Sequence, residues 1–400
     1  MTTYNFDKIT NRKGTNCLKY DFAVERGKPA DVLPLWVADM DFPVSEEITK
    51  SLHAAVDHGI YGYTQPKDAY YNALMNWMER NHNWKTEREW IVKTPGVVFA
   101  LGAAVKAFTD PGDAILIQNP VYYPFTNIIR DNDRRVVDNT LIYEKTTGQS
   151  GDNGYRIDFE DFERKLEQEH IKLFILCNPH NPVGRVWTVE ELQKLGEICL
   201  HHHVIVVSDE IHNDFVYPGY EHTVFAKVDP RFAEFAVTCT APSKTFNLAG
   251  LQISNIFIPN EKLRKAFQTE IDKTGYDEPN ALGIVACEAA YRAGEDWLEQ
   301  LRAYLLQNLN FLREYLQKKI PQIHLVEPEG TYLVWLDCSE LGITGKELDQ
   351  FIVDKAGLWL DGGSMFGPSG AAFQRVNIAC PRATLQLALD KLKTAVDTLK

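Results

Sequence analysis

The chain contains 400 residues, of which 44% are hydrophobic, and it carries a formal net charge of −13 at pH 7. This length suits two or three domains, and the acidic balance argues against a nucleic-acid-binding surface. No apolar stretch reaches the roughly 20 residues that span a bilayer, and the polar N-terminus lacks the apolar core of a signal peptide. Seven scattered cysteines without a Cys-x-x-Cys pair indicate reduced thiols, so we expect a cytoplasmic protein.

The first 45 residues have weak periodicity, and regular elements begin after them. Residues 90–94 have the pattern of a strand, Pro95-Gly96 that of a turn, and residues 97–108 that of a helix. Short apolar runs, rich in β-branched and aromatic residues, predict further strands at 114–118, 173–177, 204–208, 235–239 and 255–258. Strands that are apolar on both faces need helices on both sides, and one amphipathic pattern covers residues 190–201. The middle of the chain therefore predicts a mostly parallel α/β sheet.

The pattern changes after about residue 285 and indicates a smaller α+β domain. Leucines at helical spacing predict a long helix that ends before Pro321: Leu298, Leu301, Leu305, Leu309, Leu312 and Leu316. Strand-like runs follow at 331–337 and 373–379, and a closing helix begins at Ala383. We therefore predict an N-terminal segment over residues 1–45 that packs with the small domain, a large domain over residues 46–285, and the small domain over residues 286–400.

Lys244 follows one of these predicted strands, in the segment Ala-Pro-Ser-Lys-Thr-Phe-Asn-Leu-Ala-Gly (241–250). A lysine at a strand end, inside a small and hydroxylated loop, suits an amine that loses its proton and attacks a carbonyl. For this residue alone, a solvated loop lysine is the simpler interpretation. Other strand ends decide between the two interpretations, because they supply further parts of a binding site.

The turn at Gly96 is a candidate anion site. Glycine lets backbone N–H groups approach an anion, and the N-terminus of the following helix adds a positive dipole. Ser243 and Thr240, beside Lys244, can add hydroxyl donors. A plain strand-to-helix connection is the alternative interpretation of this motif.

Three further side chains follow predicted strands: Asp209 after 204–208, Asn181 after 173–177, and Tyr122 after 114–118. Because ligands of open α/β sheets bind beyond the carboxyl ends of strands, we expect these side chains at one site. A carboxylate can keep a pyridine nitrogen protonated, an amide can donate to a phenolic oxygen, and a tyrosine can stack on a ring. A helix N-cap, an Asn-Pro turn and a packed core tyrosine are the structural alternatives.

Arg375 lies in the otherwise apolar run 373–379. A buried guanidinium needs a partner, and its planar fork fits the carboxylate of a substrate, while an internal salt bridge is the alternative. We expect Arg382, at the edge of this segment, to be solvated.

The three histidines at 201–203 are interpreted as a helix end, because consecutive histidines cannot all face one metal ion, and we expect no metal site.

Together these segments resemble the aspartate aminotransferase-like, fold type I family of pyridoxal phosphate enzymes, over essentially the whole chain. The markers occur in the family's order: Gly96, Tyr122, Asn181, Asp209, Lys244 and Arg375. Within the family the chain is similar to the cystathionine β-lyase and cystalysin-type C–S lyases. That similarity is carried by Val-Ala-Asp-Met-Asp-Phe (37–42), Gly-Tyr-Thr (62–64), Thr-Pro-Gly-Val-Val (94–98), Pro-Val-Tyr-Tyr-Pro-Phe (120–125), Pro-His-Asn-Pro-Val-Gly-Arg-Val-Trp (179–187), Ser-Asp-Glu-Ile-His (208–212), Pro-Gly-Tyr-Glu-His-Thr (218–223) and Ala-Pro-Ser-Lys-Thr-Phe-Asn (241–247).

The resemblance implies a large domain with a mostly parallel, seven-stranded sheet, and pyridoxal 5′-phosphate as the cofactor. It implies that Lys244 binds the cofactor covalently, that Asp209 pairs with the ring nitrogen, and that Asn181 contacts the phenolic oxygen. Tyr122 is expected to stack on the ring. The phosphate is expected to meet residues of both subunits, which implies a homodimer with shared active sites: Gly96, Val97, Val98 and Ser243 from one chain and Tyr63 from the other.

The resemblance also implies how the substrate binds. Arg375 is expected to clamp the α-carboxylate, with Asn181 near it, and Tyr123 to line the catalytic cavity. Two positions depart from typical aminotransferases, which have tyrosine where this chain has His212 and arginine where it has Gln252. Both departures match the lyase branch, in which His212 is expected to lie at the cofactor, but they leave the charge partner of the phosphate open.

The implied activity is α,β-elimination from L-cystathionine or related cysteine S-conjugates, which gives a thiol such as homocysteine, pyruvate and ammonia. Lys244, Asp209, Tyr122 and Tyr123 are the residues expected to carry it. Transamination is the alternative, because it shares every step up to removal of the Cα proton. A cofactor-binding regulator that acts by protein contact is a third hypothesis. The motifs do not rank cystathionine, cysteine and cystine as the small-molecule substrate.

Overall fold

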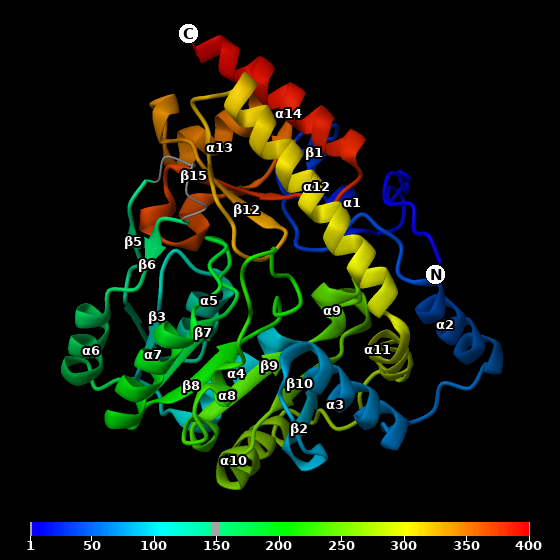
Figure 1. Cartoon of the computed structure of the whole chain (residues 1–400), viewed down its shortest axis with the longest axis vertical. Coiled ribbons are helices and arrows are strands. Elements are labelled where there is room, and N and C mark those ends of the chain that lie inside the picture. The colour runs from blue at the N-terminus through cyan, green and yellow to red at the C-terminus, as the bar shows by residue number, and fades with distance from the viewer. Residues whose placement is uncertain (1, 146–152, 400) are drawn as a thin grey trace.

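The computed structural model describes residues 2–145 and 153–399 of the chain. In Figure 1 a large sheet surrounded by helices fills the lower half of the molecule, and a smaller sheet with long helices fills the upper half. Helix α12 (Glu295–Lys319) runs from the edge of the lower half into the upper half. No helix in the described ranges combines the length and the apolar composition needed to cross a membrane.

The large sheet has, within the described residues, seven strands in the order β2-β10-β9-β8-β7-β3-β4. Only β10 runs antiparallel to its neighbours. The strands are β2 (Ile91–Thr94), β3 (Ala114–Ile117), β4 (Arg135–Asp138), β7 (Leu173–Cys177), β8 (Ile205–Asp209), β9 (Ala236–Thr240) and β10 (Ser254–Phe257). Every strand predicted in this region occurs within one residue of its predicted bounds, and the mostly parallel α/β sheet is confirmed.

Alternate residues of these strands pack on opposite faces of the sheet, as the strand period of two requires. In β3, Ile115 and Ile117 belong to one apolar core, while Ala114 and Leu116 belong to the other. The first core includes residues of α4 (Val97–Phe108), α5 (Pro124–Asp131) and α10 (Glu261–Asp272). The second includes residues of α2 (Glu46–His58), α3 (Asp68–His82), α6 (Phe159–Gln168), α7 (Val189–His201) and α11 (Ala281–Ala293). The helices predicted at 97–108 and 190–201 are therefore confirmed, and the histidine run begins at the end of α7.

The small sheet has, within the described residues, four antiparallel strands in the order β11-β12-β15-β14. They are β11 (His324–Val326), β12 (Leu333–Asp337), β15 (Phe373–Asn377) and β14 (Asp361–Gly362), and their helices are α12, α13 (Gly345–Asp354) and α14 (Arg382–Val396). The leucines that predicted α12 are each at most 2% exposed, because they lie on the stripe that packs into the core. The predicted long helix is confirmed.

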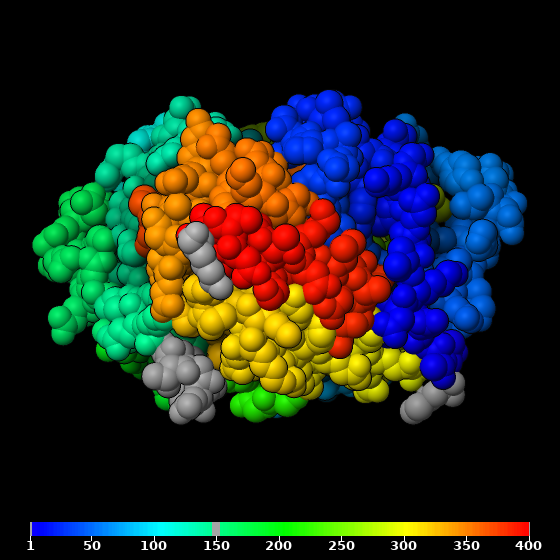
Figure 2. Space-filling model, turned by 90° about the horizontal axis from the view of Figure 1, so that it is seen from above, coloured from blue at the N-terminus to red at the C-terminus, as the bar shows by residue number. Residues whose placement is uncertain are grey.

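The N-terminal segment lies against the small sheet and its helices. Strand β1 (Leu33–Pro34) pairs in parallel with β13 (Leu358–Trp359), and α1 (Leu18–Asp21) precedes it. The side-chain amide of Asn377, at the end of β15, donates to the carbonyl oxygens of Val37 and Asp39 at 2.6 and 2.8 Å. Figure 2 shows the N-terminal residues running alongside the C-terminal ones on one face of the molecule.

Candidate active site

The carboxyl ends of three parallel strands lie side by side, and those of β7 and β8 line a cavity of about 180 Å³. Cys177 of β7, Asp209 of β8 and Cys239 of β9 are in register there. The loops that follow the strands therefore converge, as expected for an open α/β sheet. Nine of the residues predicted to form the site line this cavity: Gly96, Val97, Val98, Tyr122, Asn181, Asp209, His212, Ser243 and Lys244.

Lys244 lies in α9 (Pro242–Thr245), a single helical turn that follows β9. Pro242 begins this turn, which suits proline because the first N–H of a helix has no intrahelical partner. The Lys244 side chain lines the cavity and makes no hydrogen bond or ion pair with any described residue. Burial lowers the pKa of Lys244, and the carboxylate of Asp39 opposes that shift. The neutral amine is therefore easier to form here than in water.

Asp209 is the last residue of β8 and is 4% exposed. Its Oδ1 accepts one hydrogen bond, from the Ile211 backbone N–H at 3.2 Å. Burial raises the pKa of Asp209 to about 7, although this hydrogen bond and Lys244 both oppose the rise. A buried carboxylate with one neutral donor is poorly compensated, so a cationic group placed against it would be strongly held.

His212 and Tyr122 line the same cavity. The His212 ring is 3% exposed, and its Nδ1 has no hydrogen-bond partner among the described residues. Burial and the cation of Lys244 lower the pKa of His212 well below its usual value, so this ring is neutral. Burial raises the pKa of Tyr122, so its hydroxyl group remains protonated and can donate a hydrogen bond.

The N-terminus of α4 forms another wall of the cavity. Gly96 is the N-cap residue of this helix, and the side chain of Val98 is 44% exposed. The backbone N–H groups of the first helical turn have no intrahelical partners, so they are free to bind an anion. A Cβ added to Gly96 would meet no atom within 4 Å, which leaves open space in front of these donors. Ser243, half-buried, adds a hydroxyl group from the Lys244 turn.

Arg375 of β15 is 3% exposed and is held by three partners. Its Nη1 donates to Asn181 Oδ1 at 3.0 Å, and its Nη2 donates to the Trp36 carbonyl oxygen at 3.0 Å and pairs with Asp361. The internal salt bridge considered as an alternative is therefore present. The Nε atom is buried without a partner among the described residues, so the guanidinium keeps a donor for a ligand. We call Arg375, Asn181 and Asp361 the arginine clamp.

Of the residues singled out from the sequence for this site, several do not line the cavity: Arg375, Thr240, Tyr123, Tyr63 and Gln252. Tyr123 packs between Tyr122 and Phe366, with ring centroids 5.5 and 6.0 Å away, and burial raises its pKa. Tyr63 is 93% exposed, on the segment between α2 and α3. Gln252 is exposed and has a left-handed backbone with φ of 50°, so it places no side chain in the cavity lining.

The expectation that Arg382 is solvated was wrong. Its Nε donates to Asn308 Oδ1 at 2.8 Å, and its guanidinium lies 4.6 Å from the ring centroid of Phe311. Both partners are on α12, against which the first turn of α14 packs. A cation at the start of a helix was expected to face water, but the neighbouring helix supplies both an amide oxygen and an aromatic face.

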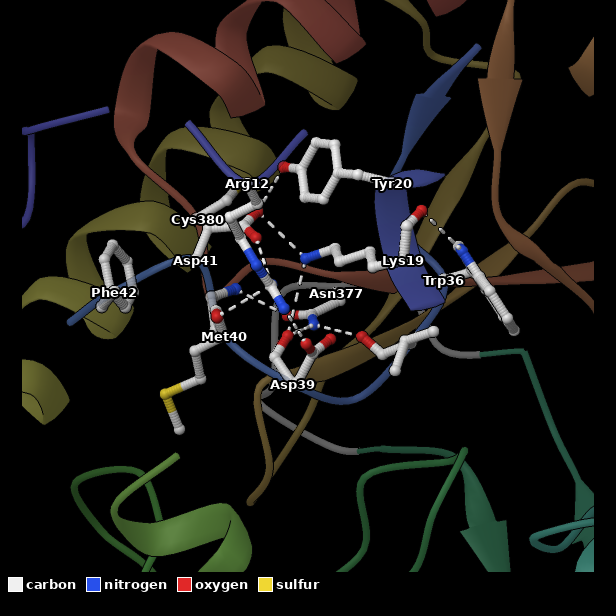
Figure 3. Close-up of polar contacts among 12 residues, drawn as sticks. Arg12, Lys19, Tyr20, Trp36, Asp39, Met40, Asp41, Phe42, Asn377 and Cys380 are labelled. Atoms are coloured by element: carbon white, nitrogen blue, oxygen red, sulfur yellow. Dashed lines mark hydrogen bonds and ion pairs between the residues drawn. The ribbon is translucent and has the colours of Figure 1, made fainter. Parts of the chain in front are cut away.

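The segment of residues 36–42 closes the cavity on the side of the N-terminal segment. Figure 3 shows charged residues converging on it, and we call Arg12, Lys19, Tyr20, Asp39 and Asp41 the N-terminal cluster. Lys19 Nζ lies 3.0 Å from Asp41 Oδ2, the Tyr20 hydroxyl donates to the same oxygen at 2.9 Å, and Arg12 pairs with both aspartates. These contacts fix the backbone that carries Ala38 into the cavity lining.

Sequence reasoning missed three residues that shape the site. Asp361 pairs with Arg375, and Asp39 is the carboxylate that most opposes the lowering of the Lys244 pKa. Asn247 ties the Lys244 loop to residues 40–42 through three hydrogen bonds. A signal for Asp361 was present, because an acidic residue in the apolar run 358–361 needs a cationic partner. A signal for Asn247 was its place three residues after Lys244, where its left-handed φ of 57° suits asparagine.

Comparison with known proteins gives the family. The family described as aminotransferase class I and II matches residues 30–392. The chain belongs to this family. It is 46% identical over 392 residues to cystathionine beta-lyase PatB of Bacillus subtilis (strain 168), an alignment that covers 98% of this chain and 100% of the relative.

Solved structures agree with that assignment. Cystalysin from Treponema denticola, which contains a pyridoxal 5′-phosphate cofactor, is 37% identical with a TM-score of 0.95, and all of both chains is covered. The PLP-bound C–S lyase from Staphylococcus hominis is 35% identical with a TM-score of 0.91 and covers 99% of this chain and 98% of that chain. The predicted fold type and the predicted similarity to the C–S lyase branch are confirmed.

Proposed function

We propose that the chain is a pyridoxal phosphate-dependent carbon–sulfur β-lyase that cleaves L-cystathionine and related cysteine S-conjugates. The products are a thiol such as homocysteine, pyruvate and ammonia. The observation that carries the proposal is the cavity beyond β7, β8 and β9. There Lys244, which has a lowered pKa and no partner among the described residues, lies with the buried carboxylate of Asp209. The identity of 46% to a cystathionine beta-lyase over nearly the whole chain supports the substrate class.

The residues present fit pyridoxal 5′-phosphate. Lys244 offers an amine to its aldehyde, Asp209 a carboxylate to its ring nitrogen, and the N-terminus of α4 with Ser243 offers N–H and O–H donors to its phosphate. Three buried groups retain capacity to bind a ligand. Among the described residues, His212 Nδ1 and Arg375 Nε have no hydrogen-bond partner, and the Asp209 carboxylate has one. When bound, the cofactor supplies a cationic ring that accepts electrons from the substrate Cα.

Lys244 then acts as the base. Its pKa is lowered by burial, so the neutral amine exists at a lower pH than in water and can take the proton from the substrate Cα. The Asp209 carboxylate would keep the ring nitrogen of the cofactor protonated, because a buried carboxylate without a cationic partner is costly. Loss of the sulfur group from Cβ follows the loss of the Cα proton, and water completes the release of pyruvate and ammonia.

Substrate orientation is assigned to the arginine clamp. The Arg375 guanidinium holds the α-carboxylate, and Asn181 and Asp361 fix the guanidinium in turn. Tyr122 covers the ring, and Tyr123 narrows the space beside Phe366. Holding the Cα–H bond perpendicular to the ring selects that bond for cleavage.

The active unit is proposed to be a homodimer with shared sites. Tyr63 is 93% exposed, Ile60 73% and Tyr61 60%, so three large side chains on the segment between α2 and α3 are largely exposed to solvent. Such a cluster is typical of an interface, and a partner subunit would cover it. Tyr63 would then add a hydroxyl group to the phosphate of the partner's site, beside the α4 N-terminus.

Two broader proposals accompany this function. The chain divides into an N-terminal segment (1–45), a large domain (46–285) and a small domain (286–400); the large sheet lies within 91–257 and the small sheet within 324–377, which supports this division. A cytoplasmic location is supported by the cysteines, because all seven are free and six are buried.

The experiment measures pyruvate release over a panel of sulfur amino acids, with 2-oxo acids added to test amino-group transfer. We expect pyruvate from L-cystathionine at a rate that 2-oxo acids do not change. Transamination is the second candidate, because aspartate aminotransferases of the same family are 24–25% identical over most of the chain. Lasting conversion of the cofactor to pyridoxamine phosphate without pyruvate would establish transamination and contradict the lyase.

A further inference from the structure

A second cavity, of about 230 Å³, lies next to the arginine clamp. Asp361, which lies opposite Arg375 in the neighbouring strand β14 and pairs with it, lines this cavity. Gln374 lines it too, with a side chain on the other face of β15 from that of Arg375. Trp36 also links the clamp to this cavity, because its carbonyl oxygen accepts from Arg375 and the residue lines the cavity. The arginine clamp and the second cavity therefore share Asp361 and Trp36.

Two cations line the second cavity without being neutralised. The side chains of Arg26 and Lys28 make no hydrogen bond or ion pair with any described residue. The Arg26 guanidinium lies 5.2 Å from the ring centroid of Trp36, and this ring stacks on Trp359 at 4.2 Å. The aromatic pair thus positions the guanidinium and leaves its N–H groups free for an anion.

A carboxylate is fixed in the same cavity. Asp349 Oδ1 accepts from Gln374 Nε2 at 2.7 Å. A Cβ added to Gly362 would lie only 2.2 Å from this oxygen, so the glycine is what lets Asp349 approach strand β14. Asp361 lies beside it and is already paired with Arg375. The cavity therefore combines two free cations with a held carboxylate that can accept further donors.

This set of charges matches a zwitterionic amino-acid group, whose carboxylate would meet the two cations and whose ammonium would meet Asp349. We propose that the second cavity binds the distal amino-acid end of a bis-amino-acid substrate, a thioether or disulfide of cysteine. Arg26 and Lys28 are then specificity residues. The proposal rests on the proposed lyase function, and it ranks cystathionine and cystine above cysteine and simple S-alkyl cysteines.

The test compares two substrates on the cofactor-loaded enzyme. We expect Arg26→Gln/Lys28→Gln to lower kcat/KM for L-cystathionine by about tenfold or more, since charge-assisted contacts are lost. S-methyl-L-cysteine, which has no distal charge, should change by less than about twofold. Lys346→Gln/Lys355→Gln is the control with the same change of charge, because both lysines are exposed, lie in or next to helix α13, which also carries Asp349, and do not line the cavity. An equal loss for both substrates, or no loss for either, would overturn the proposal.

A second variant separates the two ends of the zwitterion. Asp349→Asn should lower kcat/KM for L-cystathionine and leave S-(3-carboxypropyl)-L-cysteine unchanged, since this analogue has the distal carboxylate but no distal ammonium. If the wild-type enzyme releases pyruvate from no substrate, the proposed function has failed. Calorimetric binding of L-cystathionine then still decides the cavity: a dissociation constant about tenfold higher in the double variant supports it, and an unchanged one overturns it.

Discussion

The N-terminal cluster and the cofactor cavity both bury charged side chains, but only the cluster pairs them. Lys19 is 1% exposed, and its Nζ lies 3.0 Å from the Asp41 carboxylate, which Arg12 and Tyr20 also contact (Figure 3). Lys244, in contrast, has no partner in the described residues. A buried charge that folding leaves unpaired costs free energy, so the cavity is a place where a ligand restores the missing contacts.

Asp39 belongs to both regions. Its Oδ2 pairs with Arg12 in the cluster, whereas its Oδ1 is buried without a hydrogen-bond partner in the described chain. Among the charges that favour the protonated form of Lys244, the Asp39 carboxylate has the largest effect on its pKa. The cluster therefore both anchors residues 36–42 and sets part of the electrostatic field of the cavity. Four predictions test this contrast between paired and unpaired charges.

The largest effect is expected from Lys244→Ala. The variant should lose the visible absorbance of the covalently bound cofactor, and turnover should fall by about a thousandfold or more, because the base is gone. The free energy of unfolding of the cofactor-free protein should not fall, because the lost amine has no partner. Spectra, a pyruvate assay and denaturant unfolding measure these three quantities. Borohydride reduction followed by peptide mapping would contradict the assignment if it labelled another lysine.

Asp209→Asn should stabilise the cofactor-free protein. Burial raises the pKa of Asp209 from 3.8 to about 7, so the folded state binds this proton more tightly than the unfolded state. The contribution of Asp209 to the free energy of unfolding is greatest below pH 3.8, and it is lost as the pH rises through about 7. Removing the carboxylate should therefore raise the free energy of unfolding at pH 8 by on the order of 4 kcal/mol.

The cofactor-loaded protein should respond to Asp209→Asn in the opposite direction, because the ring nitrogen loses its anionic partner and the cofactor binds more weakly. Asp41→Asn is the matched control, since it removes a carboxylate that is already paired with Lys19 and Arg12. This control should lower the stability of both forms. If Asp209→Asn destabilised the cofactor-free protein, that result would contradict the view that the Asp209 carboxylate is poorly compensated while the charges of the N-terminal cluster are paired.

Lys19→Met should lower the free energy of unfolding by about 3 kcal/mol, because it leaves Asp41 buried with one cation fewer. The visible absorbance of the bound cofactor should remain, since Lys19 contacts no residue that lines the cavity. Denaturant unfolding and an absorbance spectrum check both points. A stable variant that has lost its cofactor would show that the cluster serves binding rather than folding.

The sequence predicts the fold well because its signal is local. In β3 and β7 every residue is apolar and buried, and a run of this kind indicates a strand that is covered on both faces. Edge strand β4 was missed because Arg135 and Asp138 flank only two valines. Strands with one exposed edge lack the continuous apolar signal.

The site was predictable where a polar residue ends an apolar strand, as Asp209 does, or lies in the loop after one, as Lys244 does. Asp361 and Asp39 escaped prediction because their importance comes from partners distant in the sequence, Arg375 in one case and Arg12 with Lys244 in the other. The first pairing depends on the register of β14 with β15, and the second on how the N-terminal segment folds against the Lys244 loop, and no local pattern encodes either one. The tertiary partner of a charge is therefore the part that sequence reading misses.

The smallest effect is expected from Asp39→Asn, which tests the link between the two regions. The Asp39 carboxylate favours the protonated amine, so its removal should lower the pKa of Lys244 further. In the cofactor-free protein, the rate of covalent binding of added pyridoxal phosphate depends on the neutral amine, and the pH at half-maximal rate should fall accordingly. Asp41→Asn is the control, because Asp41 is not among the charges that shift Lys244. An unchanged or higher pH midpoint for Asp39→Asn would show that the charge of Asp39 does not influence Lys244.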